Sequence, residues 1–593
     1  MAPRARQGQG RVPQGDPGKV GAHGTGAPPM LDARAMQPGR TGFLDTLPET
    51  RRPFLWLAVL CLALWLPGFF TVPPSDRDES RFAQATRQMV DSGDYVRLAV
   101  GQEERNKKPV GIHWAQAAVV HALEAVGVPA RAHIAAYRLP SLIGALLGVL
   151  ATFHWGRALV GRRAAFVAAA MLAPCMVLVV EAHIAKTDAA LLATIAAAMG
   201  LFGRAYLAPQ VFSSRQAAAF WAVLGIGVLL KGPIAPMVPL FAGVTLAIVD
   251  RSAPWLRALR LPWGIPLMIA MAAPWFVAIG IATEGRFFAE AVGQDMIGKV
   301  NSGAENHWGP PGLYTLIFGI TAFPSAWIVM RALPSMWTDR LRPEVRFLLA
   351  WIVPVWLLFE ALPTKLPHYV LPAFPALMLL GARWAMDPLR REPPRWLRIF
   401  SNVTLVGVAL GLGAVALGAA VMLERRPPVL AAGAAALFAG AALAWFTLRA
   451  SRGGQYGRAA LLGAILAVPV YLAVLEGVLP RLSTILLSPR IAAEVERIAP
   501  GLPADRFGIV GYHEPSLLFA RGGATRLLQD GRAAAAFLAE APGRVVAVEG
   551  RQEAAFRAEA QARGLSLREV GLQTGQSYVR GRTLALQFFD IAP

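Results

Sequence analysis

The residues best able to do chemistry lie in the charged segment that follows the first apolar run of the chain. Asp78 and Glu79 stand near its start, and Lys107 and Lys108 stand near its end. A carboxylate can act as a general base or orient a sugar hydroxyl, and Lys binds phosphate as a compact point charge. The alternative is an acidic first turn that complements a helix dipole by about a few tenths of a kcal/mol. The combination favours a site that handles a phosphate and a polarised hydroxyl.

A third acidic candidate, Asp188, ends the polar stretch Glu181-Ala-His-Ile-Ala-Lys-Thr-Asp between two apolar runs. Its structural alternative is an N-cap for the helix expected from Ala189. Charge at membrane depth is costly, so a carboxylate at this place is also a candidate catalytic residue. Lys231 interrupts a later apolar pattern, and the turn residues Gly232-Pro233 that follow it do not account for its charge.

The lysines lie where the positive-inside rule does not place them. The sequence has only seven, and the topology given below puts six of them at the outer face. Interfacial lysines that snorkel toward water are one explanation. The other is that several converge on a phosphate, which we favour for Lys108, Lys231 and Lys365. The six are Lys107, Lys108, Lys186, Lys231, Lys299 and Lys365.

Composition identifies the kind of protein that must position these residues. Of its 593 residues 55% are hydrophobic and 16% charged, and apolar runs near the ~20 residues that cross a bilayer recur from Phe54 to about Val478. The sequence therefore predicts a polytopic α-helical membrane protein. Cys61 and Cys175 both fall inside apolar runs, so redox chemistry is not expected. The net charge of +21 follows from the tail and the short loops, so no nucleic acid partner is expected.

The topology is predicted from basic loops. Residues 1–50, rich in Gly, Pro and Arg, form a disordered cytoplasmic tail, and Arg51 and Arg52 keep the N-terminus inside. About thirteen spans follow within a transmembrane domain, 51–480, one of them predicted for Ala164–Val180. The first outer loop, 71–138, carries a short amphipathic helix at Arg81–Asp91 and an apolar segment, Ile112–Val126, that reclines at the interface.

The last part of the chain, 481–593, has another character. Short β-prone runs alternate with helical stretches such as Ala533–Glu540, which predicts a small extracytoplasmic α/β domain. We interpret His513-Glu514 as a surface turn. The three β-prone runs are Phe507–Tyr512, Val545–Val548 and Thr583–Phe589.

Short segments between about residues 75 and 385 resemble the bacterial glycosyltransferase family 39 enzymes of the GT-C superfamily. They are most similar to the aminoarabinose transferases of lipid A and more distantly to protein O-mannosyltransferases. Each segment alone is weak evidence for the family. Their order along the chain and their predicted position on one side of the membrane make the set specific to it. The segments are Asp78-Glu79-Ser80-Arg81, Ser92-Gly93-Asp94, Lys108-Pro109, Arg138-Leu139-Pro140, Asp188, Lys231-Gly232-Pro233 and Lys365-Leu366-Pro367-His368-Tyr369.

The resemblance implies a GT-C fold and a sugar donor carried on undecaprenyl or a similar polyprenyl phosphate, transferred at the periplasmic face of the bacterial inner membrane. Asp78 matches the first catalytic aspartate and Asp188 the second acidic position, and Lys108 matches the lysine that holds the donor phosphate. His307 falls near the outer-loop histidine of the family. The chemistry implied is direct displacement with inversion, and phosphate is the leaving group. Further residues expected to bind substrate are Arg81, His368 and Tyr369.

The chain departs from the family pattern just before Lys108. An aromatic and an acidic residue are usual there, whereas this sequence has Arg105-Asn106-Lys107. Phe82 stands where a Tyr is common. A divalent metal site stays possible, but the absence of that acidic residue weakens the case for one. Lys107 is expected to serve as a second phosphate-binding charge.

Two functions stay open. The first is a glycosyltransferase whose acceptor is lipid A, another envelope glycan or a protein hydroxyl. The second is a transporter or flippase of a lipid-linked sugar, which predicts paired halves and charges near the bilayer centre. The predicted polar residues gather at one face instead, which favours the enzyme.

Overall fold

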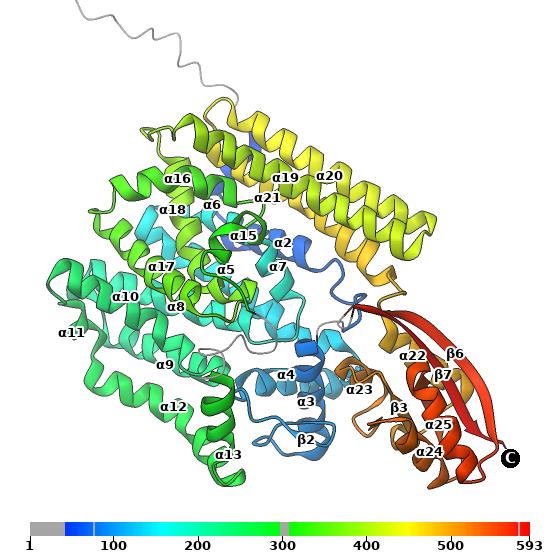
Figure 1. The fold of residues 1–593 in the computed structure, drawn as a ribbon. Coiled ribbons are helices and arrows are strands. Elements are labelled where there is room, and N and C mark those ends of the chain that lie inside the picture. The colour runs from blue at the N-terminus through cyan, green and yellow to red at the C-terminus, as the bar shows by residue number, and fades with distance from the viewer. Residues whose placement is uncertain (1–41, 75–76, 297–307, 579–580, 593) are drawn as a thin grey trace, which may run out of the picture. The chain divides into compact units, whose positions relative to one another are not determined.

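The computed structural model describes residues 42–74, 77–296, 308–578 and 581–592. Tightly packed helices form its centre: α5 (Ile134–Val160), α6 (Arg162–Leu172), α8 (Asp188–Leu207) and α18 (Phe374–Met386) (Figure 1). Small residues let α5 and α8 approach closely. A Cβ on Gly144 of α5 would lie 2.5 Å from the Cα of Ala190, so the pair packs as membrane helices with small residues at the interface do.

Seven helices are long and apolar enough to cross a membrane, or up to eight if one bent pair is a single span, within the residues that the structure describes. The bent pair is α6 with α7 (Met176–Ala182), which meet at 66°. The predicted span Ala164–Val180 therefore falls on a helix pair that is bent within its length. Pro174 lies at the break, where its missing N–H cannot continue the helix. The seven helices are Ile134–Val160, Asp188–Leu207, Leu261–Ala282, Pro367–Met386, Arg395–Glu424, Pro427–Ser451 and Tyr456–Arg481.

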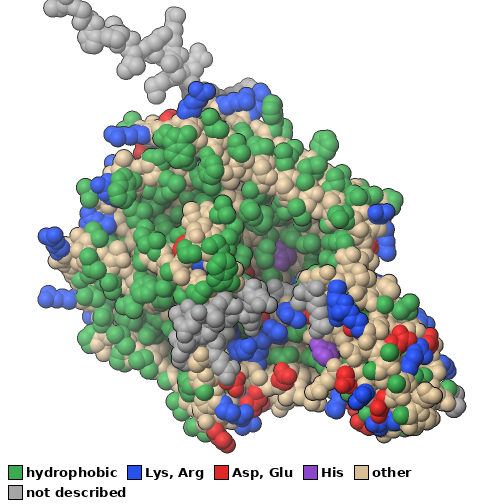
Figure 2. All heavy atoms as spheres, viewed as in Figure 1, with side chains coloured by type: hydrophobic (Ala, Val, Ile, Leu, Met, Phe, Trp, Pro, Cys, Tyr) green, Lys and Arg blue, Asp and Glu red, His purple; other side chains and the backbone are tan. Residues whose placement is uncertain are grey.

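Outer helices expose much of their apolar surface, as expected for helices that face lipid. They include α12 (Leu261–Ala282), α19 (Arg395–Ala419) and α20 (Pro427–Ser451). Figure 2 shows hydrophobic side chains over the helical part of the visible face, whereas charged side chains gather around the first loop and the C-terminal domain.

The first loop folds into two helices and a small hairpin. The amphipathic helix α3 (Arg77–Ser92) includes the predicted Arg81–Asp91 and buries Phe82 and Met89. The apolar segment predicted at Ile112–Val126 is the helix α4 (Gly111–Ala125). Between them β1 (Ala99–Val100) pairs with β2 (Glu103–Glu104).

The C-terminal region is a three-layer α/β domain. Its five strands lie in the order β4-β3-β5-β7-β6, with β3 (Phe507–Val510) parallel to β4 (Arg526–Leu528) and β5 (Val545–Glu549). The antiparallel partners are β6 (Leu567–Ser577) and β7 (Arg582–Ile591). The helices α22 (Leu487–Ile498) and α23 (Pro515–Arg521) cover one face, and α24 (Gly531–Ala539) and α25 (Gly550–Ala562) cover the other.

This domain docks on α3 and on the start of α5. Arg77 forms an ion pair with Glu514 at 3.0 Å, and Arg87 donates to the carbonyl of Phe519 at 3.1 Å. The ring of Phe519 packs edge-on against Tyr137. The interpretation of His513-Glu514 as a surface turn is therefore wrong, because Glu514 is buried in this contact.

Candidate active site

A cavity of about 820 Å³ opens between the first loop, one end of the central helices and the C-terminal domain. This volume lies in the range of small-molecule sites. Each of these parts contributes polar side chains to the wall. The charged and histidine side chains of the wall are Asp78, Arg81, Glu103, Glu104, Arg105, Lys107, Lys108, Lys186, Asp188, Lys231, Glu290, His368, His513 and Arg526.

The first turn of α3 brings Asp78 to this wall. Its carboxylate lies 3.6 Å from Arg81 and 3.9 Å from Arg105, and 43% of its side chain is exposed. Lys107 and Lys108 line the same cavity. The structure thus places a partly solvated carboxylate together with the lysine pair, about thirty residues away in the sequence. Such a group can accept a proton from a hydroxyl.

A stack of three side chains supports this wall. The guanidinium of Arg105 lies 5.1 Å from the centre of the Phe82 ring. The Phe82 ring in turn stacks on the His113 ring, with 5.2 Å between the ring centres and an interplanar angle of 12°. His113 Nδ1 is 2.7 Å from the hydroxyl of Thr86. Burial, and then the charge of Arg105, lower the pKa of His113 to about 3. The imidazole is therefore neutral, which suits a position beside a cation.

Asp188 begins α8 and reaches the cavity with two partners from distant segments. The ammonium of Lys231, at the end of α9 (Ser214–Lys231), bonds to Asp188 Oδ1. His368 Nε2 lies 3.7 Å from Asp188 Oδ2. The ring of Tyr369 lies 5.4 Å from the Lys231 ammonium and also lines the cavity. The structure brings all four of these predicted site residues together.

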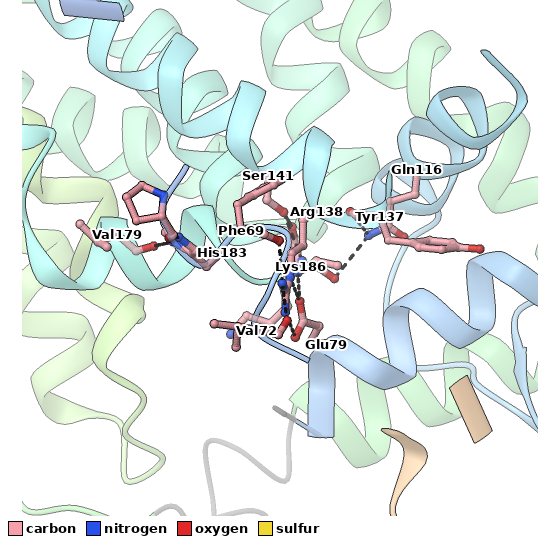
Figure 3. A network of polar contacts seen from close by, with 12 residues as sticks. Phe69, Val72, Glu79, Gln116, Tyr137, Arg138, Ser141, Val179, His183 and Lys186 are labelled. Atoms are coloured by element: carbon pink, nitrogen blue, oxygen red, sulfur yellow. Dashed lines mark hydrogen bonds and ion pairs between the residues drawn. The ribbon is translucent and has the colours of Figure 1, made fainter. Parts of the chain in front are cut away.

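Glu79 lies behind the wall and does not line the cavity. Its carboxylate forms a bidentate ion pair with Arg138, at 2.7 and 3.1 Å, and accepts the backbone N–H of Ala185 at 3.2 Å (Figure 3). Arg138 also donates to the carbonyls of Phe69 and Val72. We predicted a catalytic role for Glu79, but these contacts give it a positioning role, because its charge is compensated by a buried partner.

Lys365 also lies outside the cavity lining, although Thr364 and Leu366 belong to it. Its ammonium donates to the carbonyls of Phe359 and Glu360, at 2.8 and 2.6 Å. Burial lowers the pKa of Lys365, and the nearby Glu360 carboxylate opposes this shift. The structure thus places the predicted phosphate ligand Lys365 in a loop-stabilising role.

His307 lies outside the described residues, so its predicted substrate contact has no structural account. The neighbouring Trp308 forms an isolated bridge with Thr364.

One group within the described part of the chain offers three ligand atoms to a metal ion. The atoms come from Glu181, Asp188 and His368 and lie within 4.8 Å of one another. Both carboxylates already have ammonium partners, Lys186 for Glu181 and Lys231 for Asp188. A divalent cation would meet two fixed positive charges at this place, so the donor set does not fit one, and we derive no step through a metal.

Sequence reasoning missed three parts of the wall. Lys186 was counted among the six lysines of the predicted outer face, but it was not one of the three favoured as phosphate ligands. Arg105 was noted as a charge of the first loop and as a departure from the family pattern, and no role was assigned to it. The segment 513–529 carries no recognisable motif and reaches the cavity only through the docking of a domain.

The fold is that of a GT-C membrane protein with a C-terminal sheet domain. ArnT from Cupriavidus metallidurans, solved bound to undecaprenyl phosphate, aligns with a TM-score of 0.70 at 19% identity, over 91% of this chain and 98% of that one. The apo structure of the same protein aligns with a TM-score of 0.69. At this identity the likeness shows the fold.

The sequence comparisons agree with the fold. A family model described as dolichyl-phosphate-mannose-protein mannosyltransferase matches residues 107–277. An undecaprenyl phosphate-alpha-4-amino-4-deoxy-L-arabinose arabinosyl transferase of Pectobacterium atrosepticum is 27% identical over 59% of this chain and 62% of its own length. The Yersinia pestis counterpart is 27% identical over 60% and 64%. The chain thus spans under two thirds of these relatives. The matches confirm the predicted resemblance to family 39 glycosyltransferases of the GT-C superfamily.

Proposed function

We propose that this protein is a membrane glycosyltransferase that takes a sugar from a polyprenyl-phosphate donor. One observation carries the proposal: Asp78, Lys108 and Asp188 line a single cavity at the end of the apolar helices. A carboxylate and ammonium groups in one enclosed space are what a displacement at a sugar phosphate requires. The named relatives act with an undecaprenyl phosphate-linked sugar, which supports the same class of donor here.

In the proposed reaction an acceptor hydroxyl attacks the anomeric carbon from the face opposite the phosphate. The new C–O bond forms as the bond to the phosphate oxygen breaks, and polyprenyl phosphate leaves with the bonding electron pair. Asp78 takes the hydroxyl proton. Lys107, Lys108 and Lys231 stabilise the charge that develops on the departing phosphate. Asp188 and Tyr369 hold Lys231 in place, and Arg81 orients Asp78.

We also propose the membrane arrangement. We assign the shorter apolar helices Pro53–Trp65 and Ile234–Asp250, together with the long ones, to an arrangement of about thirteen spans. The basic loops keep the tail, 1–50, in the cytoplasm and place the cavity and the domain 481–593 at the periplasmic face of the inner membrane. The acceptor is then lipid A or another envelope glycan, because such acceptors are exposed at that face.

A transporter or flippase without catalysis is the second candidate. It would need charged groups near the middle of the apolar helices. The charged wall residues lie in the first loop, at helix ends and in the C-terminal domain, which favours transfer chemistry.

The proposal predicts that Asp78→Asn and Lys108→Ala each abolish sugar transfer. The first removes the proton acceptor and the second a phosphate contact, so a loss of at least about 100-fold is expected. Transfer of a labelled sugar from a polyprenyl-phosphate donor in proteoliposomes measures it. Asp91→Asn is the matched control, because Asp91 is an acid of the same helix whose partner, Arg131 at 2.8 Å, lies off the cavity. Full activity of either cavity variant would refute the assigned roles.

The acceptor is identified by mass spectrometry of lipid A and surface polysaccharide from a deletion strain. The loss of one sugar from lipid A is expected. Loss from another glycan would keep the transferase and replace the acceptor, whereas unchanged glycans together with accumulated donor on one leaflet would favour the flippase.

A further inference from the structure

Five ionisable side chains form a continuous array along one part of the cavity wall. Glu181 Oε1 lies 3.3 Å from the ammonium of Lys186 and 3.3 Å from His368 Nδ1. The other nitrogen of His368 is 3.7 Å from Asp188 Oδ2, and Asp188 Oδ1 bonds to Lys231. The imidazole thus joins two carboxylate–ammonium pairs. Their residues come from α7, the connection 183–187, α8, α9 and the segment before α18.

Both ammonium ends of this array line the cavity, whereas Glu181 lies behind it. The Lys186 side chain is 9% exposed and that of Glu181 is 3% exposed. Burying a lysine costs free energy unless it is paired, and the array gives each of the two lysines a carboxylate partner. The second oxygen of Glu181, Oε2, is buried and has no hydrogen-bond partner among the described residues.

The backbone that carries Lys186 is held by buried polar groups from three helices. Residues 183–187 are not helical. Ser141 of α5 donates to the carbonyl of Lys186 at 2.9 Å, Gln116 of α4 donates to that of Ala185 at 3.3 Å, and Glu79 of α3 accepts the N–H of Ala185 (Figure 3). Such fixing orients a binding group before the ligand arrives, which lowers the entropy cost of binding.

We propose that Lys186 is a further ammonium of the donor-phosphate site, in addition to Lys231, and that Glu181 and His368 are positioning residues for these two ammonium groups. An ammonium has three N–H donors, so Lys186 can keep its contact with Glu181 while it donates to a phosphate oxygen. The wall of the cavity adds further basic residues, among them Lys107, Lys108 and Arg105, that favour an anion. The inference rests on the proposed function, which supplies the phosphate.

Binding of undecaprenyl phosphate to the full-length protein in detergent tests the inference. Lys186→Met keeps the length of the side chain and removes its charge, and it should weaken binding about 10- to 100-fold, as loss of a hydrogen bond to a charged group does. Lys186→Arg should restore most of the affinity. Arg331→Met is the control: Arg331 is a buried basic residue that bonds to Ser401 and Asn402 away from the cavity, so its loss should lower stability and leave binding unchanged.

A purely structural role of Lys186 makes a different prediction. If it served only to neutralise Glu181, the double variant Glu181→Gln with Lys186→Met would recover both thermal stability and binding. Under the proposal the double variant recovers stability, and binding stays weak. This comparison holds even if Lys186→Met alone folds poorly.

The role of His368 is tested by a double-mutant cycle. His368→Gln should weaken binding, and its effect should shrink strongly in the Lys186→Met background, because residues that act through one another are not additive. Additive effects would overturn the positioning role. Wild-type protein that binds no undecaprenyl phosphate would overturn the proposed function. Wild-type binding that Lys186→Met leaves intact would overturn only the inference.

Discussion

His113 shows how a buried neutral side chain supports a charged wall. Its pKa is lowered to about 3, first by burial and then by Arg105, whereas in the unfolded chain it is near 6.5. The unfolded state therefore binds the proton more readily, so the stabilisation is present above pH 6.5 and is lost as the pH falls toward 3.

We expect the wild type to lose about 1 kcal/mol more stability than His113→Gln between pH 6.5 and pH 5.5. Thermal unfolding of both proteins at these two pH values measures the difference. Parallel losses in the two proteins would mean that His113 is protonated in the folded state.

Site residues could be predicted from the sequence where a residue type was unusual for its sequence context. Asp78, Lys108, Asp188 and Lys231 stand out as charges beside apolar runs, and all four line the cavity. Glu79 shows the limit. Neighbouring residues of a helix point about 100° apart, so Asp78 shares its face with Arg81 whereas Glu79 turns inward to Arg138. The charge of Glu79 was visible in the sequence, but its buried partner was not.

At the scale of helices, the contact between α5 and α8 sets the position of Asp188. Gly144 and Gly148 of α5 both face α8, and a Cβ on Gly144 would lie 2.5 Å from Ala190 Cα. Because Ala190 is two residues from Asp188, any shift of the start of α8 moves the carboxylate as well.

Gly144→Ala is therefore expected to lower both thermal stability and the rate of transfer, the latter by at least about tenfold, as small misplacements of reacting groups do. Gly411→Ala is the control. Gly411 lies in α19 with nothing near its Cβ position, so Ala there should be neutral or stabilise by about 0.5–1 kcal/mol. Equal activity of the two variants would show that α8 tolerates the added methyl.

Helices and strands with a clear pattern of hydrophobic residues were predicted well, and those without such a pattern were not. The pattern of α3 and the apolar runs β3, β5 and β7 agree with the predicted segments to within a few residues. No strand was predicted for β4, which has only three residues, or for β6, whose polar residues resemble a loop. The break between α6 and α7 was missed because its flanks are uniformly apolar.

For the whole molecule, the C-terminal domain belongs to the proposed active site. Its segment 513–529 lines the cavity, and Phe519 packs against Tyr137 while its carbonyl accepts from Arg87. The bond from Arg87 to Phe519 joins parts of the chain that are 432 residues apart. No local pattern in the sequence predicts such a contact.

Phe519→Ala should loosen this docking, because removing a buried aromatic side chain costs about 3–5 kcal/mol. We expect faster proteolysis after residue 481 and a lower rate of transfer, with the central helices still folded. Leu572→Ala, an exposed position of β6, should change neither. If docking is loosened and the rate of transfer is unchanged, the C-terminal domain has no role in the reaction.

The helix α3 holds Asp78 at one end of its first turn and Arg77 beside it, and Arg77 is tied to Glu514. This arrangement has a genetic consequence. In a screen for alleles that abolish the modification of the cell envelope, substitutions around codon 514 should behave like substitutions in the first loop, and an allele at one place should be suppressible by a compensating change at the other.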